Sequence, residues 1–175
     1  LRPLGPLAPA AHGPPQPRCP LSLPRGELRT RPAKLNSPGA RAITEIISHY
    51  QGQLRCHSSH GPSGSQLDTD APTDNQGRGE RFSPTDLVAT ALSTCMLTIM
   101  GIVAERHGWA LEGCSARVQK TMSSAAPRRI ERLEVWVQLP EGLEASQRGL
   151  LQRAAESCPV KVSLEGAIAM TFHWS

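Results

Sequence analysis

One segment constrains the fold of this 175-residue sequence most, because its pattern predicts a long helix with both ends marked. Ser83 is a favoured N-cap residue, Pro84 suits the first helical position, and Asp86 stands where a capping-box acid reaches back to a free backbone N–H. Gly108 is a typical helix stop. We expect a helix over residues 84–107, about 36 Å long at ~1.5 Å per residue, which crosses a small domain or reaches into a partner subunit.

Apolar side chains cover most of the circumference of this predicted helix. A surface helix would leave one polar face, whereas a helix that is apolar all round is buried. We therefore expect a buried helix. Its apolar residues are Leu87, Val88, Ala91, Leu92, Cys95, Met96, Ile99, Met100, Ile102 and Val103.

Shorter patterns on either side of the helix indicate the fold class. Residues 43–55 are rich in β-branched and aromatic residues, residues 61–64 form a turn pattern, and the polar residues 68–81 predict a surface loop. After the helix, alternating residues predict strands at 110–122, 130–139 and 170–174, and an amphipathic helix at 144–157. The order strands, helix, strands, helix, strand predicts an α+β domain.

Residues 1–40 differ in composition from the rest. They hold ten of the sixteen prolines and six basic side chains against one acid, and such a stretch buries too little apolar surface to fold. We expect a disordered Pro/Arg-rich extension at 1–40 and one folded domain at 41–175. The extension is also compatible with an organelle transit peptide.

The charge, the cysteines and the hydropathy exclude several functional classes. The net charge is +4; residues 1–40 contribute +5, so residues 41–175 have a net charge of −1. Residues 41–175 also lack a stripe of basic side chains, so we do not expect a nucleic-acid-binding protein. No window reaches 18 consecutive apolar residues, so no membrane span is expected. The five cysteines are irregularly spaced, which favours a reducing compartment, and we expect a cytoplasmic protein unless residues 1–40 direct it to an organelle.

Two cysteines are candidates for chemistry. Cys95 lies in the middle of the long helix, and Cys158 lies between a helix end and Pro159, where it can cap a further short helix. A cap position lowers the pKa of a thiol by exposing it to backbone N–H groups. The alternative is that both act as small apolar core residues, as buried free cysteines usually do.

An ordered set of short segments resembles the OsmC/Ohr superfamily, in its broader OsmC-like branch. The resemblance covers roughly residues 46–175 and implies an α+β fold with two long helices packed against sheets, an intertwined homodimer, and active sites at the dimer interface. The segments are Ser83–Leu87, Ala91–Cys95, Lys120–Met122, Pro127–Ile130 and Ala155–Val160.

The resemblance also implies a thiol peroxidase cycle that defends against oxidative stress. The thiolate of Cys95 attacks a hydroperoxide and becomes a sulfenic acid, and Cys158 condenses with it to a disulfide. A small dithiol, or a lipoyl- or thioredoxin-type reductant, restores the thiols. The thiolate is the nucleophile, so no metal and no cofactor is required.

The sequence departs from this pattern at the residues that assist the thiolate. The family has a Glu ten residues before the reactive cysteine, where this chain has Thr85; the next residue, Asp86, is more simply a capping-box acid. The family's activating Arg follows an early strand, where this chain has residues 57–61 instead. The possible supporting residues are Thr85, Asp86, His60 and Arg81, and Arg55 and Arg78 are further substitutes for the family's Arg.

Three alternatives remain open from the residues. A non-catalytic dimer that binds a small apolar ligand near Met96 and Met100 is the main rival. Cys56, His57 and His60 offer metal ligands without a fourth partner, and a polar strand end is the favoured interpretation. A third group is either an anion-binding patch or, as we favour, a solvated strand edge, and comprises Lys120, Arg128, Arg129 and Arg132.

Overall fold

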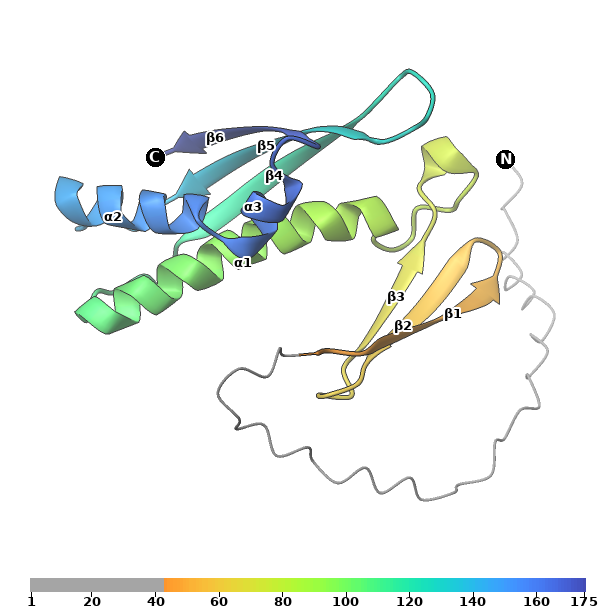
Figure 1. Ribbon diagram of the computed structural model, residues 1–175, viewed down its shortest axis with the longest axis horizontal. Helices are drawn as coiled ribbons and strands as arrows, with labels where there is room; N and C mark the ends of the chain where they lie inside the picture. Colours follow the sequence, from red (N-terminus) through yellow and green to blue (C-terminus); the bar gives the residue numbers. More distant parts are fainter. Residues whose placement is uncertain (1–42) are drawn as a thin grey trace, which may run out of the picture. The chain divides into compact units, whose positions relative to one another are not determined.

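A computed structural model describes residues 43–175 and contains two three-stranded sheets with three α-helices (Figure 1). The predicted α+β class is confirmed. The residues expected to form the disordered extension, 1–40, lie outside the described part. The elements are β1 (Ile46–Gly52), β2 (Arg55–His60), β3 (Gln66–Asp70), the 3-10 turn η1 (Thr73–Asn75), α1 (Pro84–His107), β4 (Ser115–Met122), β5 (Ile130–Gln138), α2 (Ala145–Glu156), α3 (Pro159–Leu164) and β6 (Ala169–Trp174).

The core forms where α1 and α2 pack on one face of the second sheet (Figure 1). β5 is the central strand, antiparallel to β4 and parallel to β6, and α2 and α3 make the crossover between β5 and β6. Alternate residues of β5 point into this core, as its sequence pattern predicted. The fully buried side chains include Leu92, Met96 and Met100 of α1, Leu133 and Val135 of β5, and Leu151 of α2.

Helix α1 begins and ends where its sequence signals predicted. The Asp86 backbone N–H donates to the Ser83 hydroxyl at 3.2 Å, and the Ser83 backbone N–H donates to the Asp86 carboxylate at 2.8 Å. Gly108 adopts a φ of 68°, the left-handed conformation that a glycine C-cap supplies. The capping box therefore fixes where the chain enters the helix.

The expectation that α1 is buried all round is wrong for the single chain. Its side facing the second sheet is fully buried, but Ala91, Thr94 and Thr98 are exposed, and Ile102 keeps 39 % of its surface. By length and composition alone α1 also suits a membrane span. Its packing against the second sheet is that of a core helix, with one apolar side left uncovered.

The first sheet, β1–β2–β3, is a pair of antiparallel hairpins with little apolar cover. Ile46 and Ile47 are neighbours and so point to opposite faces, yet they are 65 % and 45 % exposed, and Tyr50 is 67 % exposed. Three strands need an apolar face packed on something to be stable. The first sheet therefore presents apolar surface that the described part of the chain does not cover.

Two predicted boundaries differ from the structure. Residues 68–70, expected in a loop, belong to β3, where Asp68 pairs with His57 and Arg81, and fully buried Asp70 accepts the backbone N–H of Glu80. The strand expected from residue 110 begins at Ser115, because a turn closed by the Cys114 N–H and the Leu111 carbonyl precedes it. The turn at residues 61–64 is confirmed between β2 and β3.

Substitution of Gly77 tests the packing of the loop that links β3 to α1. A Cβ on Gly77 would lie 1.7 Å from the Ala71 carbonyl oxygen, so Gly77→Ala forces the backbone apart. We expect the free energy of unfolding to fall by about 1–3 kcal/mol in urea denaturation. The matched control is Gly101→Ala in α1, where an added Cβ would meet nothing within 4 Å beyond the adjacent residues and backbone of its own helix, and a gain of about 0.5–1 kcal/mol is expected. Equal stability of the two variants would contradict this account.

Candidate functional site

The structure brings Cys95 and Cys158 together. Cys95 lies midway along α1, is partly buried, and packs against the core cluster. Cys158 is the N-cap residue of α3 and is fully buried in the same cluster, near enough to Cys95 for the neighbouring thiol to raise the pKa of the Cys158 thiol. Two cysteines from separate helices thus lie together at the edge of the core, as a reversible disulfide requires.

The environment of Cys158 was predicted correctly in geometry and wrongly in its effect. Its sulfur accepts the backbone N–H of Lys161 at 3.3 Å, as expected of a cap. Burial is nevertheless the largest influence and raises the pKa of the Cys158 thiol; the Lys161 N–H lowers it in part, and the contact with Cys95 raises it further. Cys158 is therefore held as a neutral thiol, not as a thiolate.

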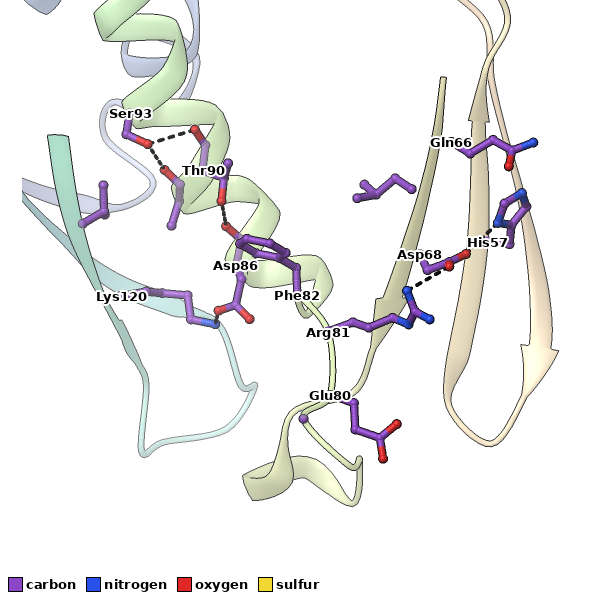
Figure 2. A pocket seen from close by; sticks show the side chains of 14 residues that line it. His57, Gln66, Asp68, Glu80, Arg81, Phe82, Asp86, Thr90, Ser93 and Lys120 are labelled. Atoms are coloured by element: carbon purple, nitrogen blue, oxygen red, sulfur yellow. Dashed lines mark hydrogen bonds and ion pairs between the residues drawn. The ribbon is translucent and has the colours of Figure 1, made fainter. Parts of the chain in front are cut away.

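A cavity of about 1050 Å³ is lined by neither of these cysteines. It lies between β2, β3, the first turns of α1, and β4 (Figure 2). Its charged groups already pair with one another: Asp68 bonds His57 at 2.6 Å and Arg81 at 3.0 Å. The bond between Asp68 and His57 is the main cause of the lowered pKa of Asp68, ahead of the opposing effect of burial.

A lysine that sequence reasoning assigned to a solvated edge faces this cavity. The Lys120 ammonium donates to the Thr85 hydroxyl at 2.7 Å and to the Asp86 carboxylate at 2.6 Å, and its side chain is only 15 % exposed. Arg128, from the same predicted edge, is exposed and pairs with the exposed Asp74 at 2.7 Å, so the solvated-edge interpretation is wrong for Lys120 but not for Arg128. The alternation along β4 is the sequence signal that places Lys120 inward, because Lys120 shares one face of the strand with Ala116, Val118 and Met122.

The four possible supporting residues do not lie at the thiol pair of their own chain. Asp86 precedes Cys95 by nine residues, which places it about 13 Å along α1 and on the opposite side of the helix. Thr85 lines a separate cavity of about 340 Å³. His60 bonds Ser63 at 2.6 Å in the β2–β3 turn, and Arg81 is held by Asp68.

The geometry gives no support to a metal site at Cys56, His57 and His60. Cys56 and His57 are adjacent in β2, so their side chains point to opposite faces of the sheet. His57 is bonded to Asp68 and His60 to Ser63. Within residues 43–175 no three His, Cys, Asp or Glu side chains are grouped as metal ligands.

Asp86 links the start of α1 to β4, and the link depends on pH. Burial opposes ionisation of Asp86, but hydrogen bonds from Lys120 and Ser83 outweigh it and hold the pKa of the carboxyl below its usual range. A carboxyl whose pKa is lower in the folded chain stabilises the fold above its unfolded value, near ~3.9, and loses that effect as pH falls through the folded value.

We therefore expect Asp86→Asn to lower the free energy of unfolding by about 1 kcal/mol at neutral pH, in the range of a lost helix cap. The difference from wild type should begin to shrink below about pH 4, because there the carboxyl of the unfolded chain takes up a proton while the folded-state carboxyl stays ionised down to its own lower pKa. Urea denaturation across pH 3–8 measures this. Glu131→Gln, on an exposed site of β5, is the control, and a difference that stays constant to pH 3 would contradict the linkage.

Comparison with known proteins supports the fold. A family model described as OsmC-like protein matches residues 77–173. A Psychrobacter arcticus structure, named for an osmotic-stress-induced and detoxification response, is 36 % identical, with a TM-score of 0.72 over 78 % of this chain and 99 % of that one.

Two more distant structures share the fold. An organic hydroperoxide resistance protein OsmC from Legionella pneumophila is 20 % identical, with a TM-score of 0.63 over 78 % of this chain and 98 % of that one. The organic hydroperoxide resistance protein OhrB of Bacillus subtilis is 15 % identical, with a TM-score of 0.56 over 77 % and 98 %. A comparison with curated proteins found no match. The family match and the Psychrobacter relative show that this chain belongs to the OsmC-like family.

Proposed function

We propose that this chain is a thiol-dependent peroxidase that reduces organic hydroperoxides in oxidative-stress defence. The observation that carries the proposal is that Cys95 of α1 and Cys158, the cap residue of α3, lie together at the edge of the core. Family membership supports it, and so do the names of the Legionella and Bacillus structures, which refer to organic hydroperoxide resistance.

The proposed cycle uses the different environments of the two thiols. Cys95 is the more accessible sulfur, so its thiolate attacks the terminal oxygen of the hydroperoxide; the O–O bond breaks, an alcohol leaves after protonation, and Cys95 becomes a sulfenic acid. Cys158 is enclosed and neutral until then. The Cys158 sulfur then attacks the Cys95 sulfur and forms the disulfide. The hydroxyl of the sulfenic acid takes up the Cys158 thiol proton and leaves as water.

A reductant with two thiols completes this proposed cycle, either as a small dithiol or as a lipoyl- or thioredoxin-type partner. It reduces the disulfide to two cysteine thiols and is itself oxidised to a disulfide. The free cysteines fit a reducing compartment, and we propose the cytoplasm.

A homodimer is part of the proposal. The first sheet leaves Ile46 and Tyr50 exposed, and α1 leaves Ile102 exposed, which is apolar surface of the kind that marks an interface. Thr85, Asp86, His60 and Arg81 lie away from the thiols of their own chain, so any support they give to Cys95 comes from a second copy.

The rival apolar-ligand protein is less well supported. Met96 and Met100 are fully buried in the packed core and line none of the cavities described, so the expected site beside them is filled by the protein itself. A thiol contact also has no role in a protein that only binds an apolar ligand.

The thiol cycle predicts distinct products from two single substitutions. After one equivalent of an alkyl hydroperoxide, wild type should form a Cys95–Cys158 disulfide, and Cys158→Ser should accumulate sulfenic acid at Cys95. In Cys95→Ser the peroxide reaction should slow by at least about 100-fold, since the nucleophile is lost. Mass spectrometry and thiol titration measure this, with Cys114→Ala as control. Slow oxidation that neither substitution changes would refute the cycle.

The dimer predicts an effect of charge on the exposed apolar surface. Wild type should have twice the mass of one chain in light scattering, and Tyr50→Asp or Ile102→Asp should raise the dimer dissociation constant by at least about tenfold, which corresponds to ~1.4 kcal/mol. Glu131→Gln should leave it unchanged. A wild-type protein that remains monomeric at micromolar concentration would contradict the assembly.

A further inference from the structure

We propose that regeneration of the thiols runs in one direction: the reductant attacks the Cys95 sulfur of the Cys95–Cys158 disulfide, and Cys158 departs as a thiolate that Lys161 stabilises. This inference rests on the proposed function for its place in a cycle. The choice of which sulfur is attacked and which one leaves depends on the disulfide and its surroundings.

Access to the two sulfurs is unequal. A thiolate displaces one sulfur of a disulfide by approaching the other from the side opposite the S–S bond, so the attacked sulfur must be reachable. Cys158 is 0 % exposed and belongs to the core cluster with Leu151 and Ala155. Cys95 is only partly buried and neighbours the exposed Thr94 on α1. An incoming thiolate can therefore reach the Cys95 sulfur. To attack the Cys158 sulfur it would have to pass through the packed core.

The two sulfurs also differ in how well they are stabilised as leaving thiolates, and Cys158 is the better stabilised. The Lys161 backbone N–H already donates to the Cys158 sulfur, at 3.3 Å, and an ionised sulfur accepts that bond more strongly. The Lys161 ammonium bonds Glu165 at 2.8 Å, which is the main cause of its raised pKa, and charge on Cys158 is a smaller cause. Lys161 thus stabilises an ionised Cys158 directly through its backbone N–H, and its ammonium adds a weaker attraction between opposite charges.

The step balances as a thiol–disulfide exchange. The reductant's thiolate forms a new S–S bond to Cys95, the Cys95–Cys158 bond breaks, and its electron pair goes to Cys158, which later takes a proton from water. A second thiol of the reductant then attacks the mixed disulfide at the reductant's own sulfur and releases Cys95. Lys161 touches neither substrate nor reductant and is a positioning residue.

The first experiment identifies the attacked sulfur without using peroxide. Full-length protein is oxidised with diamide, its remaining thiols are blocked with iodoacetamide, and 2-mercaptoethanol is added for seconds before N-ethylmaleimide. Peptide mass spectrometry should find mercaptoethanol on Cys95 and maleimide on Cys158, in at least about tenfold excess over the reverse pattern. The reverse pattern, an equal mixture, or failure of diamide to join the two cysteines would overturn the proposal.

The second experiment tests Lys161. Reduction of the diamide-formed disulfide by dithiothreitol should be about threefold to tenfold slower in Lys161→Met, because the leaving thiolate is less stabilised. Lys161→Arg should restore most of the rate, and Glu165→Gln, which frees the ammonium, should not slow it. A Lys161→Met rate equal to wild type, or loss that Lys161→Arg does not rescue, would remove Lys161 from the step.

These outcomes are independent of the peroxidase activity. A protein that forms no disulfide with hydroperoxide, yet whose diamide-formed disulfide is opened at Cys95, would refute the proposed function alone. A protein that turns over peroxide but is opened at Cys158 would refute this inference alone.

Discussion

The packing of α1 against β5 is the interaction on which the rest of the structure depends. Leu92, Met96 and Met100 meet Leu133, Val135 and Leu151 in one cluster, and all six are fully buried. Burying side chains of this size stabilises a fold by about 1.5–3 kcal/mol each, more than the ~0.5–1.5 kcal/mol of a typical hydrogen bond between neutral groups. The same contact sets the rotation of α1 about its axis. That rotation decides which residues face the core, which face the large cavity, and which are left uncovered.

The thiol pair is a consequence of this rotation. Because the buried side of α1 is held by the sheet and by α2, Cys95 is held at the margin of the core, where the cap of α3 reaches it. Two effects then compete at Cys158: burial favours its neutral form, and the Lys161 N–H favours its ionised form. In the reduced protein burial outweighs this hydrogen bond, so the Cys158 thiol stays neutral. The Lys161 N–H stabilises the Cys158 sulfur most strongly when that sulfur is ionised.

Local signals predicted α1 to the residue, since its cap, its first proline and its final glycine are read within a few positions. They also placed Cys158 as a cap. They failed where long-range pairing decides: β3 carries Asp68 and Asp70, which look like loop residues until His57, Arg81 and a backbone N–H bond them. Lys120 was missed for the same reason, because its partner Asp86 lies 34 residues earlier. The expected pKa of Cys158 erred because burial cannot be read from a cap motif.

The uncovered first sheet links the stability of this protein to the proposed homodimer. Whatever surface covers Ile46 and Tyr50 binds the folded chain and not the unfolded one, so it adds to the free energy of unfolding by mass action. In such a dimer, dilution lowers the free energy of unfolding. The melting temperature rises with protein concentration when the covering surface is a second copy, and a stability measured at one concentration describes that concentration alone.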